Sequence, residues 1–376
     1  MGLPYRLFIR PSLKFQDSEK AHYRSLFFLK KLSAFSVSRF ALSAVYQTKH
    51  DLPVNVFGHY YKHPFGLAAG MDKKAEALLG WQAIGLSFAE IGGVTMLEQS
   101  GNPKPRMFRS DKHKALINRM GFNNPGSEKI SQTLDLHFKK HGPPKVPLWV
   151  NLGKSKVTEN SDAHIDYSTT MDRLWDYGDL FVINVSSPNT PNLRDLQNQD
   201  DLSKIIDSCM KVNENNSQTK NIPIKPILVK VAPDMSYEQL ELIVKTAIKS
   251  GCSGIVATNT TTSRVEQLDE KDAKTMAEKG GMSGLPLVDK STEFIRLIYQ
   301  MTNGNLPIVG VGGIMNAEHA WQKITAGATL LQAYSAFVFE GPSISKNIVK
   351  GLNKKLREHN LTSIEQAIGL DHKGDD

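Results

Sequence analysis

Short apolar runs alternate with segments of helical period along the chain from residue 65 onward. Nearly continuous apolar runs stand at 65–70, 86–93, 146–153, 179–187, 226–233, 253–260, 306–313 and 328–336. Such runs are typical of parallel strands that are buried on both faces. Segments between them, for example 73–84, 236–251 and 316–327, have helical spacing. Eight strands with intervening helices predict an α/β fold, a (β/α)8 TIM barrel, and a doubly wound open sheet is the alternative.

Polar residues and glycines collect at the carboxyl end of every predicted strand. Strand by strand, they are Lys73; Gly93 and Thr95; Asn151; Asn184 and Ser187; Lys230; Thr258 and Asn259; Gly312 and Gly313; and Tyr334 and Ser335. The active site of a barrel lies at the carboxyl ends of its strands. One polar residue there could belong to a turn, but eight strands that end in this way predict a single shared site.

The first 50 residues have a different pattern. Residues 3–11 are apolar and basic, and 18–33 and 36–47 predict two short helices. In the first helix Tyr23, Leu26 and Phe27 share a face, and Lys20 and Arg24 lie elsewhere. This pattern fits a helix in a membrane interface, and it equally fits a helical pair packed on the barrel. We expect a small N-terminal helical extension at 1–50, a barrel at 51–370 and a disordered tail at 371–376.

Composition and charge leave several functional classes open. The 376 residues are 40% hydrophobic and 22% charged, which is ordinary for a globular protein. The net charge of +8 suits nucleic acid, anionic lipid or an anionic small molecule equally well. Cys209 and Cys252 lack metal-ligand spacing, so we expect reduced thiols and no metal site. No apolar stretch approaches the ~20 residues that span a bilayer, and no signal-peptide pattern is present.

The glycines after the seventh predicted strand indicate a phosphate site. The sequence GVGG at 310–313, followed by a helix near Asn316, provides backbone N–H groups that an anion can approach closely. Residues 334–336 add further donors. The chain has neither a Walker motif nor a Rossmann fingerprint. A mononucleotide with one phosphate therefore fits better than a dinucleotide.

The series of motifs resembles the dihydroorotate dehydrogenase family. These motifs are AAGMDK (68–73), EIGGVT (90–95), GNPKPRMFR (101–109), NRMGFNN (118–124), VNLGKS (150–155), NVSSPNTPNLR (184–194), LVKVAPD (228–234), TNTTTSR (258–264), GGMSGLPL (280–287), GVGGI (310–314) and QAYSAF (332–337). The match runs in order from Phe65 to Phe339. The resemblance implies FMN as cofactor and the oxidation of (S)-dihydroorotate to orotate in de novo pyrimidine (UMP) biosynthesis.

The resemblance places the catalytic base at Ser187. Removal of a hydride to FMN leaves a proton that needs a base, and a serine needs burial and oriented partners to act as one. Taken alone, Ser187 could be a turn residue.

Carboxamides match a pyrimidine rim of alternating carbonyl and N–H groups because they offer both a donor and an acceptor. The implied substrate-binding residues are Lys73, Asn118, Arg119, Met120, Gly121, Phe122, Asn123, Asn184, Asn189, Asn259 and Thr260.

The resemblance also implies the residues that hold FMN. They are Ala68, Ala69, Gly70, Met71, Asp72, Gly93, Asn151, Asn184, Lys230, Thr258, Gly284, Gly313, Tyr334 and Ser335. Lys230 interrupts an apolar run, where an unpaired lysine is costly. The family pattern puts it at the electron-rich edge of the flavin, where a cation stabilises the reduced form. Gly93 departs from the pattern, since relatives often have Ser or Thr there, and only a backbone contact remains.

Serine rather than cysteine at position 187 indicates class 2, the quinone-dependent and membrane-associated members. In that class the N-terminal helices form the quinone entrance, and His22 and Arg109 resemble residues that line it. Taken alone, His22 could be a surface histidine. We expect a peripheral protein on the cytoplasmic side of a bacterial inner membrane, with a membrane quinone and the lipid surface as partners.

Three other functions remain to be weighed. A soluble family member that reduces fumarate or NAD predicts Cys at position 187 and no amphipathic leader. A flavin enzyme that reduces uridine in tRNA fits the positive charge but needs a catalytic Cys at a strand end and usually an RNA-binding domain, so we expect no nucleic acid partner. A barrel that only binds a nucleotide or acts as a scaffold does not require Ser187 and Lys230.

Overall fold

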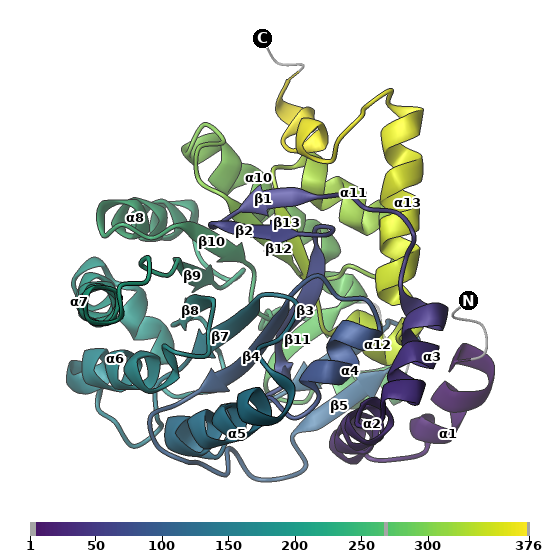
Figure 1. Cartoon of the computed structure of the whole chain (residues 1–376), viewed down its shortest axis with the longest axis horizontal. Helices are drawn as coiled ribbons and strands as arrows, with labels where there is room; N and C mark the ends of the chain where they lie inside the picture. Colours follow the sequence, from purple (N-terminus) through teal and green to yellow (C-terminus); the bar gives the residue numbers. More distant parts are fainter. Residues whose placement is uncertain (1–4, 267–269, 374–376) are drawn as a thin grey trace.

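A closed barrel of eight parallel strands forms the centre of the computed structural model, which describes residues 5–266 and 270–373 (Figure 1). In chain order the strands are β3 (Phe65–Asp72), β4 (Ala89–Val94), β7 (Leu148–Leu152), β8 (Leu180–Asn184), β9 (Ile227–Val231), β10 (Gly254–Ala257), β12 (Ile308–Val311) and β13 (Leu330–Ala333). The barrel closes where β13 pairs with β3, with Leu331 beside Phe65. The predicted TIM barrel is confirmed, and the open sheet is excluded.

Helices alternate with the strands and surround the barrel (Figure 1). They are α4 (Leu78–Ala83), α5 (Gly126–His141), α6 (Ala163–Leu174), α7 (Gln199–Lys220), α8 (Tyr237–Lys249), α9 (Glu270–Met276), α10 (Val288–Met301), α11 (Ala317–Thr325), α12 (Ser335–Glu340) and α13 (Ile344–Glu358). Short 3-10 turns lie at η2 (Asn160–Asp162), η3 (Leu193–Gln197) and η4 (Leu285–Leu287). Helices α8 and α11 begin as predicted, because the side chains of Ser236 and Asn316 cap their first turns.

Helix α4 is shorter than the segment 73–84 predicts. The Asp72 carboxylate accepts hydrogen bonds from the backbone N–H groups of Glu76 and Ala77, at 2.8 and 2.9 Å. These bonds hold residues 73–77 in a turn, so the helix starts only at Leu78. The turn keeps Lys73 at the end of β3.

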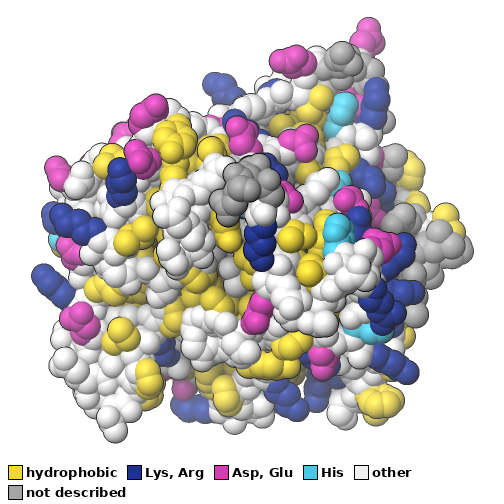
Figure 2. All heavy atoms as spheres, turned by 90° about the horizontal axis from the view of Figure 1, so that it is seen from above, with side chains coloured by type: hydrophobic (Ala, Val, Ile, Leu, Met, Phe, Trp, Pro, Cys, Tyr) yellow, Lys and Arg dark blue, Asp and Glu magenta, His cyan; other side chains and the backbone are white. Residues whose placement is uncertain are grey.

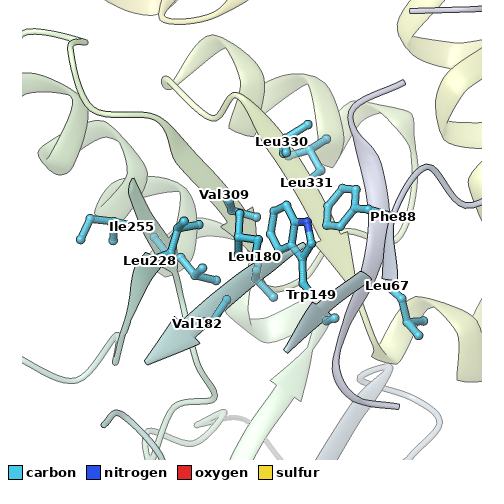
Figure 3. Packing of buried hydrophobic residues seen from close by; sticks show 14 of the residues in the cluster. Leu67, Phe88, Trp149, Leu180, Val182, Leu228, Ile255, Val309, Leu330 and Leu331 are labelled. Atoms are coloured by element: carbon cyan, nitrogen blue, oxygen red, sulfur yellow. The ribbon is translucent and has the colours of Figure 1, made fainter. Parts of the chain in front are cut away.

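An aromatic layer fills the end of the barrel where the strands begin. Trp149 of β7 stacks on Phe88 with 4.3 Å between ring centroids, among aliphatic side chains (Figure 3). The hairpin of β1 (Val54–Val56) and β2 (His59–Tyr61) adds Tyr61, whose ring stands edge-on to both. Since alternate residues of a strand share a face, Glu90 and Asn151 lie one layer further along. The interior is thus apolar at one end and polar toward the other.

A small antiparallel sheet stands at the carboxyl end of the barrel. Its strands are β5 (Met107–Ser110), β6 (Ala115–Asn118) and β11 (Gly281–Gly284), with β6 in the centre. The sequence does not predict this sheet, because β6 and β11 are far apart in the chain and β11 reads GMSG, with two glycines of low strand propensity. The pairing sets Asn118 opposite Gly281 and brings both to the barrel mouth.

The N-terminal elements lie together on one side of the barrel, next to α4 and α12 (Figure 1). They are η1 (Tyr5–Ile9), α1 (Arg10–Lys14), α2 (Ser18–Ser33) and α3 (Ser36–Tyr46), and the last two match the predicted helices. Leu26 of α2 is buried, whereas Phe35 and Phe40 are 70% and 77% exposed. The edge of the molecule on this side carries hydrophobic side chains beside Lys and Arg (Figure 2). The pair therefore packs on the barrel and also presents an apolar outer surface.

None of the helices within 5–266 and 270–373 is both long enough and apolar enough to cross a bilayer. Likewise, these residues contain no group of three or more His, Cys, Asp or Glu side chains that could hold a metal ion.

The ordered part of the C-terminus extends further than the sequence predicts. After η5 (Glu365–Ala367), the turn η6 (Leu370–His372) includes two residues of the expected disordered tail. The ring of His372 stacks on Tyr299, and Asp371 pairs with Arg296 at 3.0 Å. The tail prediction is therefore wrong for 371–373, and 374–376 lie outside the described residues.

Candidate active site

A cavity lies at the carboxyl ends of the barrel strands and is lined by residues from all eight of them or from the loops that follow. It brings together most of the predicted site residues. These are Ala68, Ala69, Gly70, Lys73, Gly93, Asn118, Met120, Gly121, Phe122, Asn151, Asn184, Ser187, Asn189, Lys230, Thr258, Asn259, Thr260, Gly284, Gly313, Tyr334 and Ser335. Residues that are up to 267 positions apart in the chain, from Ala68 to Ser335, therefore share one site.

Four of the residues predicted to bind substrate or cofactor do not line this cavity. Arg119 turns its guanidinium away, donating to Glu278 at 2.7 Å and to the Pro105 carbonyl at 2.8 Å. Asp72 is occupied by the turn before α4 and by the Trp81 indole N–H, at 3.0 Å. Met71 lines a second cavity instead. The Asn123 amide donates to the Tyr23 hydroxyl of α2 at 2.8 Å. The geometry therefore does not support direct contact between these four side chains and the substrate or cofactor.

Ser187 is buried in the cavity wall, in the loop between β8 and η3. Its hydroxyl oxygen accepts a hydrogen bond from the backbone N–H of Asn189 at 3.3 Å. Arg194 holds this loop by donating to the Ser186 carbonyl at 3.2 Å and pairing with Asp234 at 3.3 Å. Asp234 also accepts from the backbone N–H of Thr262 at 2.7 Å, which ties the loop after β10 to the same anchor. The loop that carries Ser187 is thus tied to its surroundings on both sides of the serine.

Carboxamides from separate elements form the rim around Ser187. Asn189 donates to the Asn118 side-chain oxygen at 3.2 Å, and Asn259 donates to the Asn184 side-chain oxygen at 3.3 Å. Thr260 follows Asn259 and lines the cavity too. Their mutual hydrogen bonds fix the directions of these amides, so donors and acceptors face the cavity in a set pattern.

Two lysines are buried in the cavity walls. Lys73 donates to the Gly70 carbonyl at 2.9 Å, and burial lowers its pKa to about 8, although the charge of Glu19 acts in the opposite direction. Lys230 has no hydrogen-bond or ion-pair partner in the part of the chain that the structure describes. Burial lowers its pKa as well, and the charge of Glu90 counteracts that effect. A buried ammonium without a partner suits an electron-rich ligand group.

Glycines and two serines make a cradle at one end of the cavity. A Cβ on Gly313, whose φ is +73°, would lie 2.4 Å from a Val288 side-chain carbon, and a Cβ on Gly284 would lie 2.1 Å from the Lys114 carbonyl oxygen. Both positions therefore exclude a side chain. The hydroxyls of Ser283 and Ser335 meet at 2.8 Å beside them. Backbone N–H groups and hydroxyls in a loop of this kind bind phosphate.

A second cavity of about 660 Å³ lies between the barrel and the N-terminal helices. Both predicted quinone-access residues, His22 and Arg109, line it. Burial, with a smaller contribution from the charge of Lys73, lowers the pKa of His22 to about 3, so the imidazole is neutral at physiological pH. The ring of His22 stacks on Tyr334 at 6.1 Å. Tyr334, Met107 and Leu116 line both cavities and form the wall between them.

The sequence analysis overlooks two polar residues of the barrel interior. Gln332 of β13 lines the first cavity, and Glu90 of β4 lies fully buried beneath it. Both stand inside apolar runs, in LSFAEIGG and ATLLQAYSA. The same signal that singles out Lys230, a polar residue in a buried strand, could have identified them.

Comparisons with known proteins agree on one family. The family model described as dihydroorotate dehydrogenase matches residues 51–356. A dihydroorotate dehydrogenase (quinone) of Trichodesmium erythraeum is 44% identical over 369 residues, which cover 95% of each chain. One from Natronomonas pharaonis is 41% identical over 371 residues, covering 99% of this chain and 100% of the other. The structure of an Eimeria tenella DHODH in complex with ferulenol superposes with a TM-score of 0.85 at 34% identity, covering 95% of this chain and 96% of that one.

Proposed function

The chain belongs to the dihydroorotate dehydrogenase family, and we propose that it works with FMN at the mouth of its barrel and with Ser187 as the catalytic base. It oxidises dihydroorotate to orotate in pyrimidine biosynthesis and passes the electrons to a quinone, as its relatives do. The family uses a flavin, and its quinone-dependent members are peripheral membrane proteins. One observation carries the proposal: Ser187, the carboxamide rim and the unpaired Lys230 line a single cavity.

Three features of the cavity fit FMN. The cradle of Gly284, Gly313 and the two serine hydroxyls suits one phosphate, which favours a mononucleotide. Lys230 offers its ammonium to a group that becomes negatively charged on reduction. Gln332 has a buried side-chain oxygen without a partner among the described residues, which suits a ring N–H. Bound in this cavity, the flavin supplies the acceptor for the hydride.

The chain's own residues bind the substrate and remove its proton. The rim of Asn118, Asn189 and Asn259 matches the alternating donors and acceptors of a dihydropyrimidine, and Lys73 attracts its carboxylate. As Ser187 takes the proton from the ring carbon that faces it, its own hydroxyl proton passes to water at the mouth of the cavity, so the side chain ends the step as a neutral hydroxyl. The N–H of Asn189, 3.3 Å from the serine oxygen, stabilises the partial negative charge that this oxygen carries while its own proton leaves.

The second cavity supports a quinone site. Its walls carry Phe28 and Leu32 of α2 and Leu42 of α3, which suit an apolar ring with a tail. The neutral His22 and the Arg109 guanidinium supply polar contacts for quinone oxygens. The wall of Tyr334, Met107 and Leu116 separates this site from the first cavity, so electrons have a short path.

The outer surface of α2 and α3 supports contact with lipid. Phe27, Phe35, Val37 and Phe40 are between 53% and 80% exposed, and such a row of apolar side chains beside basic ones is typical of helices in a membrane interface. We assign residues 1–50 to membrane and quinone access and 51–370 to the flavin barrel. The protein then acts on the cytoplasmic side of the inner membrane.

A visible spectrum of the purified protein, followed by anaerobic addition of dihydroorotate, tests this function. The protein should carry a yellow flavin that dihydroorotate bleaches, whereas orotate at the same concentration should shift the flavin absorbance band without bleaching it. A short-chain quinone should then restore the colour, and NAD or fumarate should not. A protein that is colourless and fails to bind added FMN would contradict the cofactor, and recovery of the colour with NAD or fumarate would contradict the acceptor.

A further inference from the structure

A carboxylate stands inside the barrel, directly under the proposed flavin site. Glu90 of β4 has none of its surface exposed. Phe88, two residues earlier, belongs to the aromatic layer, so Glu90 occupies the first polar layer above it. An ionised carboxylate is costly to bury unless other groups bind it. The function proposed above gives this residue no task.

Glu90 is held by two carboxamides, one from β7, which pairs with β4, and one from β13, which lies beyond β3. The Asn151 amide nitrogen donates to one carboxylate oxygen and the Gln332 amide nitrogen to the other, each at 2.6 Å. A carboxylate only accepts hydrogen bonds, so both amides must turn their NH2 groups toward Glu90 and their oxygens away from it. Glu90 therefore determines which atom each amide presents to its other neighbours.

The orientation of the Asn151 amide fixes the orientation of further amides through a chain of hydrogen bonds that leads to the substrate rim. The Asn151 oxygen accepts from the Asn184 amide at 2.9 Å. The Asn184 oxygen then accepts from the Ser186 hydroxyl at 2.9 Å and from the Asn259 amide at 3.3 Å. At the other end, the Gln332 oxygen is left as a buried acceptor without a partner in the described part of the chain. One carboxylate thus orders the amides on both the cofactor side and the substrate side.

Glu90 also supplies the negative charge that acts on Lys230. The two side chains form no direct ion pair, yet the charge of Glu90 opposes the effect of burial on the pKa of Lys230. Interactions between charges in a buried site of this kind are much stronger than in water. The negative charge of Glu90 disfavours negative charge on a flavin bound beside it. The positive charge of Lys230 has the opposite effect.

We infer that Glu90 is a positioning residue that orients the carboxamides around the flavin and offsets the charge of Lys230. This inference rests on the proposed function, since it concerns the same cofactor. Its consequence is that Lys230 alone would hold the electrons too tightly on the reduced cofactor, and that Glu90 lowers the reduction potential enough for transfer to the quinone.

The reduction potential of the bound flavin tests the inference. Each loaded protein is equilibrated anaerobically with a reference dye, and the absorbance of flavin and dye is measured. Glu90→Gln should shift the equilibrium at least tenfold toward reduced flavin, a rise of about 30 mV for a two-electron couple. The orotate dissociation constant should also rise several-fold, because the amides lose their fixed direction. Glu98→Gln, a change of the same kind on an exposed side chain of the loop after β4, should alter neither quantity.

Glu90→Asp separates charge from simple structural damage. It keeps one carboxylate in the layer on a shorter side chain, so its dye equilibrium should stay within threefold of the wild-type value, while orotate binding is weakened. It also tests the inference if Glu90→Gln does not accumulate with flavin. A Glu90→Gln potential equal to that of the wild type, or a Glu90→Asp equilibrium shifted by more than threefold toward reduced flavin, overturns the inference. A wild-type protein that binds no FMN instead contradicts the proposed function.

Discussion

At the scale of single residues, charged side chains inside apolar strands mark the site. Lys230 and Glu90 are each buried in a barrel strand, where a charge without compensation is strongly unfavourable. Lys230 lacks a partner among the described residues, and Glu90 has two amide donors. This difference suits their tasks, because a group that awaits a ligand stays unpaired and a group that orients others is fully bonded. The unpaired Lys230 therefore lowers the stability of the free protein, and the proposed flavin would compensate for this cost.

Lys73 leads to a prediction about pH. Burial, the largest influence, lowers its pKa to about 8, so in the free protein the ammonium loses its proton as the pH rises through 8. The anionic carboxylate of orotate needs the charged form. The orotate dissociation constant should be constant below pH 8 and should rise by up to about tenfold per pH unit above it. Lys73→Met should bind orotate weakly at every pH.

Orotate titrations of the flavin absorbance between pH 6 and pH 9.5 measure this dependence. Lys129→Met removes an exposed lysine of α5 and should keep the wild-type profile. If the Lys73→Met protein retains the step near pH 8, another group is responsible.

At the scale of elements, helix α2 serves both cavities. Glu19 in its first turn forms a buried ion pair with Arg106, at 2.7 Å. Arg106 also donates to the Ser100 and Asn102 carbonyls, and the Asn102 amide donates to the Asn189 carbonyl at 3.0 Å, in the loop that carries Ser187. The other end of α2 carries the exposed Phe27 and Phe28. The helix that carries the proposed lipid-binding surface therefore also supports the substrate site.

Two variants should separate these tasks. Glu19→Gln leaves Arg106 buried without its charge partner, which costs about 3–5 kcal/mol, so reduction of the flavin by dihydroorotate should slow at least tenfold. The triple variant Phe27→Ser, Phe35→Ser, Phe40→Ser removes only exposed side chains. It should keep the wild-type rate of flavin reduction and lose most binding to anionic vesicles and most turnover with a long-chain quinone. Rapid-mixing kinetics and vesicle sedimentation measure the two effects. Equal loss of flavin reduction in both variants would contradict this division.

At the scale of the whole molecule, the sequence predicts the barrel and most of the residues at the carboxyl ends of its strands. Buried parallel strands read as apolar runs and active-site residues follow them, so Asn184, Ser187 and Lys230 could be assigned to one site from their positions alone. The sheet of β5, β6 and β11 could not be predicted, because its register depends on contacts distant in sequence. The same holds for Asn123 and Arg119, whose partners Tyr23 and Glu278 come from other parts of the chain.

The N-terminal helices show a further limit of sequence reasoning. Their pattern fits both a membrane surface and packing on the barrel. In the structure the helices pack on the barrel through residues such as Leu26, which is buried, and leave others such as Phe40 exposed. A helical pattern reports which residues are apolar but not which solvent or surface each one meets. Only the fold, which sets α2 and α3 against α4, distinguishes the two faces.

The rate of anaerobic flavin reduction in Ser187→Ala tests the central claim most directly. A positioned base contributes roughly 10²–10⁴-fold to such a step. The variant should therefore bind FMN and orotate as the wild type does, and dihydroorotate should bleach its flavin at least a hundredfold more slowly. Ser187→Cys, which restores an ionisable side chain, should recover part of the rate as the pH rises. A Ser187→Ala protein whose flavin is reduced at the wild-type rate would contradict the account.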